Sequence, residues 1–263
     1  MRIIDCHCHI YPEKIAAKAV KAIGSFYDLH MDYDGTAATL LKSGAAAGIT
    51  DFLVHSVATT PHQVRSVNEF VAAEVRQFPD KLIGFGTLHP AGEDIEGDLA
   101  HLRELGLKGV KLHPDFLGIA IDDPSYFKIY ELCSDAGLPI CFHTGDDRYD
   151  FSNPNRVAPL ARRFSRLKII AAHFGGYTLW EEGSIAFKDI KNIVVDCSSS
   201  LFALSPDKAR EIVRRYGADR VLFGTDYPMW PAEKEIERFF DMGLTQEENE
   251  LILHANAERL LGF

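Results

Sequence analysis

The sequence has few cysteines, few tryptophans and no long apolar run. Its five cysteines are an odd number in a chain of 263 residues, which is long enough to bury a core without disulfides. We therefore expect reduced thiols and a cytoplasmic protein. No apolar stretch approaches the roughly 18 residues that span a bilayer, and no basic segment followed by an apolar run resembles a secretion signal. These absences argue against a disulfide-rich secreted protein and against a membrane protein.

Positive charge is also scarce. Lys and Arg total 28 against 38 Asp and Glu, and the net charge of −10 disfavours binding to nucleic acid or to anionic membranes. The sequence also lacks a glycine-rich phosphate loop after its first predicted strand, where Asp5-Cys-His-Cys-His9 stands instead. A small-molecule substrate is the expected partner.

Short β-rich runs alternate with helical patterns along the whole chain. Several of these runs are continuously apolar, as expected for parallel strands covered on both faces. Roughly 250 residues is typical of a (β/α)₈ TIM barrel, so we predict that residues 1–263 form one such α/β domain. A doubly wound sheet is the competing architecture, because it also alternates strands and helices. The eight predicted strands are residues 2–5, 51–54, 82–86, 109–112, 139–142, 168–171, 192–196 and 220–223.

Segments with helical periodicity lie between these strands. An extra C-terminal helix is predicted over residues 246–261, after the eighth strand. Glycines follow several of the helical segments, where a left-handed residue would end a helix. The other predicted helices include residues 36–47, 62–78, 94–105, 125–136, 206–216 and 232–242, and the glycines are Gly48, Gly106, Gly137, Gly217 and Gly243.

Histidine is the residue type that stands out, with eleven copies. Seven of them sit at or just past the C-terminal end of a predicted strand. In a parallel barrel those ends lie on one face, which is where active sites are built, so these imidazoles should converge. They are His7, His9, His55, His89, His113, His143 and His173.

The strand ends also carry a potential metal site. His7 and His9 are two residues apart, and side chains at this spacing on a strand point to the same side. On the same argument Cys6 and Cys8 face away from the metal. Asp226, after the last strand, could ligate a metal, accept a proton or cap a turn beside Pro228.

This pattern resembles the amidohydrolase superfamily, and within it the amidohydrolase-2 group. That group includes the decarboxylases of aminocarboxymuconate semialdehyde and of γ-resorcylate, together with lactonases and hydratases. The resemblance spans nearly the whole chain. The segments that carry it are Asp5-Cys-His-Cys-His-Ile-Tyr-Pro12, His143, His173-Phe-Gly-Gly176, Gly224-Thr-Asp-Tyr-Pro228 and Asn256-Ala-Glu-Arg-Leu-Leu261.

The resemblance implies one divalent metal ion. His7, His9 and His143 would bind it, Asp226 would be a further ligand, and His173 would be the acid/base. Imidazoles and a carboxylate suit Zn²⁺ best, and Mn²⁺, Fe²⁺ or Co²⁺ could also bind, because ligand type constrains metal identity only loosely.

Three further residues could contact the substrate. Lys111 lies near the end of the fourth predicted strand, where binuclear superfamily members carry a bridging carboxylated lysine or a glutamate. The amidohydrolase-2 resemblance instead implies an unmodified lysine that forms an ion pair or binds substrate. Arg148 could orient a substrate carboxylate or pair with a neighbouring aspartate. His113 could contact substrate or make a structural hydrogen bond.

The favoured hypothesis is an enzyme, a metal-dependent hydrolase of a small amide, ester or lactone. A metal-activated water would attack the carbonyl carbon, assisted by His173, and Asp226 would relay the proton. The first alternative is non-oxidative decarboxylation or hydration of a small aromatic or unsaturated acid at the same site. The second is a non-catalytic barrel with a vestigial site. The chain length leaves little room for a capping domain, so we expect a fairly open site and a small substrate, and a homodimer is one assembly to test.

Overall fold

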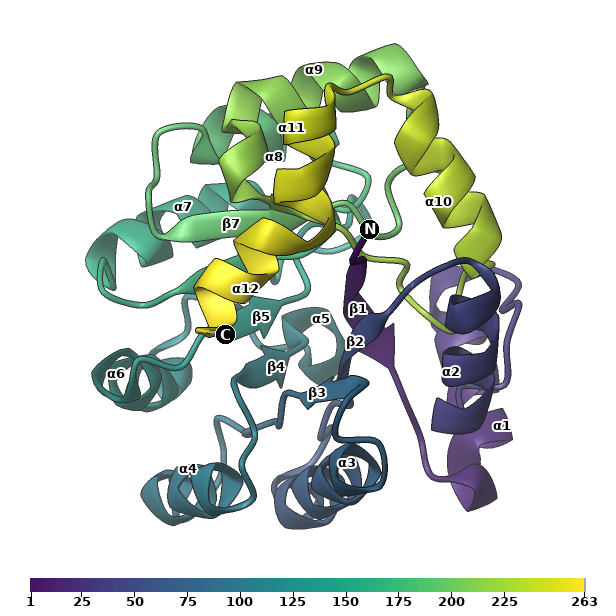
Figure 1. Cartoon of the computed structure of the whole chain (residues 1–263). Helices are drawn as coiled ribbons and strands as arrows, with labels where there is room; N and C mark the ends of the chain where they lie inside the picture. The colour runs from purple at the N-terminus through teal and green to yellow at the C-terminus, as the bar shows by residue number, and fades with distance from the viewer. Residues whose placement is uncertain (263) are drawn as a thin grey trace.

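The computed structural model describes residues 1–262, and its parallel strands form a ring surrounded by helices (Figure 1). The strands overlap the eight predicted runs. The first differs most, because it continues through His9. They are β1 (Ile4–His9), β2 (Asp51–His55), β3 (Leu82–Gly84), β4 (Val110–Leu112), β5 (Ile140–Phe142), β6 (Ile169–Ala171), β7 (Ile193–Asp196) and β8 (Val221–Leu222).

Backbone hydrogen bonds close the ring at its two seams. Strands β1 to β3 form one ladder and β4 to β8 another. Between β3 and β4, the Lys111 N–H donates to the Gly86 carbonyl at 2.7 Å. Between β8 and β1, the Cys6 N–H donates to the Phe223 carbonyl at 2.8 Å. The predicted (β/α)₈ barrel is therefore confirmed, and the doubly wound sheet is excluded.

The helices form the outer layer of the barrel in Figure 1. Each predicted helix is present, and the glycines named above all adopt positive φ. The helices are α1 (Glu13–Tyr27), α2 (Ala37–Ala46), α3 (Val64–Gln77), α4 (Ile95–Glu104), α5 (Pro114–Leu117), α6 (Phe127–Ala136), α7 (Pro154–Arg163), α8 (Trp180–Phe187), α9 (Pro206–Tyr216), α10 (Ala232–Asp241), α11 (Gln246–Glu250) and α12 (Asn256–Leu261), with short 3₁₀ turns at Pro61–Gln63, Pro124–Tyr126, His173–Gly175 and Ala218–Arg220.

The core has an inner and an outer layer. Apolar side chains that point into the barrel, including Cys6 and Leu53, form the inner cluster, and those that point toward the helices, including Cys8, form the outer one. Cys6 and Cys8 therefore face opposite ways, contrary to the expectation from a regular strand. The pairing register of β1 and β2 shifts between Asp5 and Cys8, and this irregularity breaks the two-residue alternation.

The C-terminal segment covers the end of the barrel at which β1 begins (Figure 1). A π-helical turn, Leu251–Ala255, joins α11 and α12, so the predicted helix is continuous in direction but not in hydrogen-bond pattern. Leu260 and Leu261 pack against the inner cluster. The Asn256 side chain donates to the Val221 carbonyl at 2.7 Å. These contacts seal the barrel opposite the predicted catalytic face.

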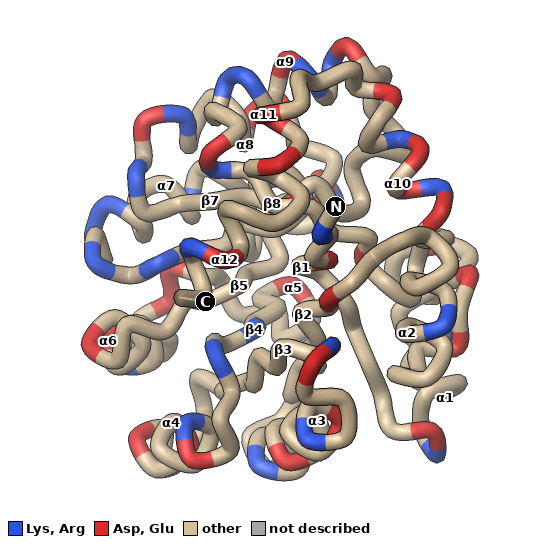
Figure 2. The backbone as a smooth tube through the Cα atoms, viewed as in Figure 1, with Lys and Arg blue, Asp and Glu red and all other residues tan. Residues whose placement is uncertain are grey.

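Charged residues of both signs lie mainly on the outer helices and loops (Figure 2). Among the residues that the structure describes, no helix is long and apolar enough to cross a membrane.

One buried carboxylate, Glu235 on α10, provides a test of the fold. Burial raises its pKa to about 7, and Arg238 forms an ion pair with it. The protonated carboxyl group stabilises the folded state fully at pH values below 4.5, which is the pKa of glutamate in the unfolded chain. This stabilisation is lost as the pH rises from there through about 7, the pKa in the folded state. In the unmodified protein, the free energy of unfolding should fall by up to roughly 3 kcal/mol between pH 5 and pH 8 because of this group. We expect Glu235→Gln to abolish that fall. Urea unfolding at both pH values measures it, and an unchanged pH slope in the variant would contradict the assignment.

Candidate active site

Three ligand atoms meet at the C-terminal end of the barrel. His7 Nε2 and His9 Nε2 lie 3.3 Å apart, and Asp226 Oδ1 lies 3.5 Å from each of them. Donors that share a tetrahedral ion at about 2.0–2.1 Å are separated by roughly 3.3–3.4 Å. The spacing therefore fits one ion, and the predicted grouping of His7, His9 and Asp226 is present.

A second carboxylate orients His7. Asp196, the last residue of β7, lies with Oδ2 2.9 Å from His7 Nδ1 and is fully buried. A carboxylate on one ring nitrogen fixes the tautomer and leaves the other nitrogen free to bind a metal. Sequence reasoning missed this role for Asp196, although its place at a predicted strand end was the signal available.

Lys111 lies inside the barrel next to the same histidine. Its Nζ is 3.0 Å from His7 Nε2 and 3.6 Å from Cys141 Sγ, and the side chain is fully buried. The lysine thus lies beside the three-atom cluster, and its predicted contact with substrate stays a prediction.

His143 and His173 form a pair beside the cluster. His143 Nδ1 lies 3.1 Å from His173 Nε2, while His143 Nε2 is buried without a hydrogen-bond partner. On its other side, His173 Nδ1 is 3.0 Å from Ser198 Oγ and 4.0 Å from Asp226 Oδ2. This places His173 between His143 and Asp226, and its acid/base role stays a prediction. The ring of His143 also stacks on His113 with centroids 4.1 Å apart, and its role as a metal ligand stays a prediction.

The backbone is strained at both predicted catalytic residues. His173 and Asp226 each have φ 60, a left-handed conformation that residues other than glycine seldom adopt. Such conformations cost of order 1–3 kcal/mol and collect at functional sites. Asp196 helps to hold the first one, because its Oδ1 accepts the His173 N–H at 3.1 Å.

Burial sets the charge state of the site. It lowers the pKa values of His9 and His173 to about 4 each. Burial would raise the pKa of Asp226, but the adjacent imidazoles of His7, His9 and His173 hold it well below its usual value. At neutral pH, His9 and His173 are therefore neutral and Asp226 is ionised, and these are the forms that bind metals.

Helix α1 closes the mouth of the barrel. Its last residue, Tyr27, places its hydroxyl 2.9 Å from His113 Nε2 and 3.4 Å from His143 Nδ1. The cavity above the cluster, lined also by Ile23, measures ≈ 20 Å³, the size of one water molecule. The segment between β1 and β2 therefore folds back as a lid over part of a site that the sequence predicts to be fairly open.

Arg148 fastens this lid. Its guanidinium makes two hydrogen bonds to the buried carboxylate of Asp146, at 2.8 and 2.6 Å, and one to the Phe26 carbonyl at 2.7 Å. Of the two roles predicted for Arg148, pairing with a neighbouring aspartate is the one that the structure displays. His113, in contrast, lines the small cavity and stacks on Phe116 with ring centroids 3.5 Å apart.

A much larger cavity of ≈ 910 Å³ adjoins the cluster on the side of α1 and α3. It shares His9, Ile23 and Phe116 with the small cavity. Its wall is mostly apolar, with Lys14 and Lys18 at its edge. This cavity provides a path between solvent and the histidine cluster.

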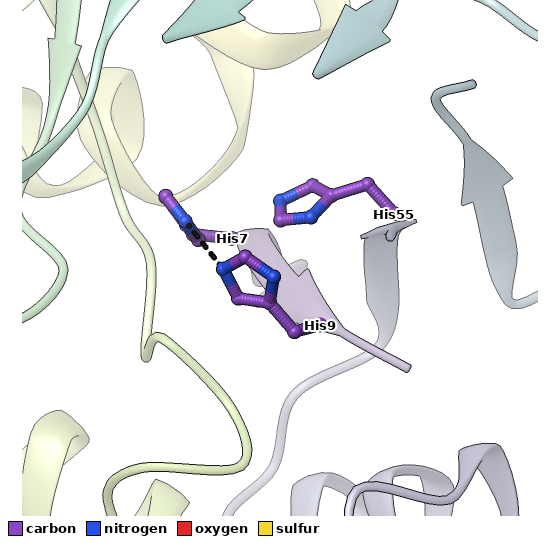
Figure 3. Close-up of side chains that lie close together, drawn as sticks. All are labelled: His7, His9 and His55. Carbon is purple, nitrogen blue, oxygen red and sulfur yellow. Dashed lines mark hydrogen bonds between the residues drawn. The ribbon is translucent and has the colours of Figure 1, made fainter. Parts of the chain in front are cut away.

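The strand-end histidines that were predicted to converge do so only in part. His7, His9, His113, His143 and His173 meet at the barrel mouth. His55, for which no role was predicted, lies beside His7 and His9 (Figure 3). His89, in contrast, accepts the Ala91 N–H at 3.1 Å within its own loop.

This chain is similar in sequence and in fold to several known proteins. The chain is 28% identical over 238 residues to the 2-amino-3-carboxymuconate-6-semialdehyde decarboxylase of Dictyostelium discoideum, a match that covers 74% of this chain and 65% of that relative's length. It superposes on an uncharacterised TIM-barrel protein from Bordetella bronchiseptica with a TM-score of 0.82 and 23% identity, covering 100% and 99% of the two chains.

A third similar protein contains a metal. The dihydroxybenzoic acid decarboxylase from Polaromonas, solved with bound manganese and the inhibitor 2-nitroresorcinol, matches with a TM-score of 0.76 and 16% identity over 99% and 97% of the two chains. The two structural likenesses support the fold. The sequence model of the amidohydrolase family matches residues 4–263. This chain, with its barrel and its strand-end histidines, therefore belongs to the amidohydrolase family.

Proposed function

We propose that the protein is a metal-dependent, non-oxidative decarboxylase of a small aromatic or unsaturated carboxylic acid. The observation that carries the proposal is the convergence of His7, His9 and Asp226 at 3.3–3.5 Å beside His173. The decarboxylases among the similar proteins support this reaction over the hydrolysis that residue types alone favoured.

The donor set fits a divalent cation. Three ligand atoms have the separation of tetrahedral donors, and Asp196 orients His7 as a metal-binding histidine is normally oriented. A bound cation would hold and polarise the oxygen atoms of the substrate. Zn²⁺ stays the prediction from ligand type, and Mn²⁺ is supported by the similar decarboxylase that contains it.

The chain itself must supply a proton. Decarboxylation breaks the bond between the carboxylate carbon and its neighbour, and the electron pair stays on that neighbour, which then takes up a proton as CO₂ leaves. His173 is the proposed donor, and Asp226, at 4.0 Å, would stabilise its protonated form. An anionic substrate beside His173 would further favour that form, so that substrate binding itself promotes protonation of the donor.

The remaining polar groups would position the substrate and exclude water. His113 and Tyr27 already touch at 2.9 Å above the cluster, and both line the small cavity. The small cavity holds no more than one water, whereas the adjoining cavity of ≈ 910 Å³ also reaches His9, so we propose that the substrate approaches the cluster from that side. The lid formed by α1 would keep the reacting carbon separated from solvent on the other side. Lys111 and Arg148 stay predicted substrate contacts.

A paired substrate panel tests this function. We expect release of CO₂ from one or more hydroxybenzoates or muconate-like acids, loss of that activity with a chelator, and recovery with Mn²⁺ or Zn²⁺. Amides, esters and lactones form the other half of the panel. Metal-dependent turnover of a lactone or ester without CO₂ from any acid would replace this function by hydrolysis, and activity that survives complete metal removal would refute both.

A further inference from the structure

His55 is a buried imidazole whose ring nitrogens have no hydrogen-bond partner. It is the last residue of β2, and the register of the sheet places it opposite His9 on β1. Its side chain has no exposed surface, and both Nδ1 and Nε2 are unpartnered. Leaving a buried polar atom unsatisfied costs about 1–3 kcal/mol, so two on one ring require an explanation.

The ring of His55 faces the two histidines of the metal cluster (Figure 3). Its centroid lies 4.9 Å from that of His7 and 4.4 Å from that of His9, and it meets both rings nearly edge to face. One ligand nitrogen from each of the three residues lies within 4.8 Å of the other two. A cation near His7 Nε2 and His9 Nε2 would therefore have a third imidazole within a small side-chain rotation.

The carbonyl of His55 holds the backbone in place around this ring. It accepts the Ile10 N–H at 3.0 Å, directly after the HxH pair. The main chain of β2 is thus tied to the segment that carries His7 and His9, and only the imidazole is left without a partner. A rigid backbone with an unpartnered donor atom is the arrangement expected of a preformed ligand.

We propose that His55 is an additional imidazole ligand of the divalent ion held by His7, His9 and Asp226. The inference rests on the proposed metal-dependent function and adds a residue to its site. The competing explanation is that an ordered water satisfies the His55 ring, in which case the ring does not contribute to metal affinity.

Co²⁺ is the probe for this proposal, because its visible absorption reports the number and type of its ligands. Metal-free protein would be titrated with Co²⁺ alone, and the affinity measured by competition with a chromogenic chelator. The test variant is His55→Phe, which keeps a ring of similar size and removes both nitrogens. The matched control is His89→Phe, another buried histidine past a strand end, whose hydrogen bonds are to the backbone of Ala91 and Thr59.

We expect His55→Phe to weaken Co²⁺ binding at least ~100-fold and to change the visible spectrum, while His89→Phe binds as the unmodified protein does. His55→Gln serves if the phenylalanine variant does not fold, as judged by the thermal midpoint of the metal-free proteins. An unchanged affinity and spectrum in a folded His55 variant would overturn the proposal in favour of a water partner.

The same measurements separate this proposal from the proposed reaction. Co²⁺ binding that depends on His55, in a protein that releases no CO₂ from any acid, would keep His55 as a ligand and refute the decarboxylase. Decarboxylation by a protein whose Co²⁺ affinity does not depend on His55 would support the decarboxylase and refute the role of His55 as a ligand.

Discussion

Asp226→Asn is expected to remove the tightly bound divalent ion and to lower kcat/KM by roughly 10³-fold or more. Asp226 Oδ1 is 3.5 Å from both His7 Nε2 and His9 Nε2, so its charge is the anionic part of the donor set. An amide of the same shape retains an oxygen but loses the charge, so its interactions with the bound ion and with His173, now 4.0 Å away, weaken together. Metal analysis of the purified variant and steady-state kinetics measure the two effects.

Glu235→Gln is the matched control for Asp226→Asn. It makes the same chemical change at another buried carboxylate, on α10, where the partner is Arg238 rather than a histidine. We expect it to bind metal normally and to turn over substrate normally. An Asp226→Asn protein that kept full metal content would show that the histidines alone hold the ion, and one that kept full activity would remove Asp226 from the mechanism.

His173→Asn is expected to lower kcat by about 10²–10⁴-fold while metal content stays unchanged. The imidazole lies 3.1 Å from His143 Nδ1 and 4.0 Å from Asp226 Oδ2, where it could hold a proton beside the cluster without being one of its three closest atoms. Asparagine approximates the ring in size and can still approach Ser198, but it cannot carry a proton at neutral pH.

The split between metal content and turnover separates a chemical role of His173 from a structural one. A structural role would lower the thermal midpoint and the metal content together. The strained left-handed backbone at this position makes asparagine a suitable replacement, because asparagine tolerates that conformation better than most residues. Unchanged kcat in a metal-loaded variant would mean that another group supplies the proton, and a non-catalytic barrel would follow only if no substrate were found.

The sequence predicted the scaffold well because a parallel barrel has a local signature. Each strand is a short apolar run, each helix has its own periodicity, and a glycine follows several of the helices, so neighbouring residues suffice to identify them. The least predictable strand was β1, which continues through His9 and carries a register shift. That shift arises from pairing with β2, a contact between segments about 45 residues apart that periodicity cannot report.

The sequence by itself determined the barrel, the family and the grouping of His7, His9 and Asp226, because parallel strands of one barrel must end on one face. Only the tertiary structure decided how that face is used. In the folded chain, Arg148 pairs with Asp146 and Asp196 accepts a hydrogen bond from His7 Nδ1. The His55 ring has no hydrogen-bond partner, and α1 lies over the mouth of the barrel. These outcomes depend on side-chain directions and loop paths, which long-range packing sets. The alternatives at each position differ by only a few kcal/mol, too little for local sequence to choose between them.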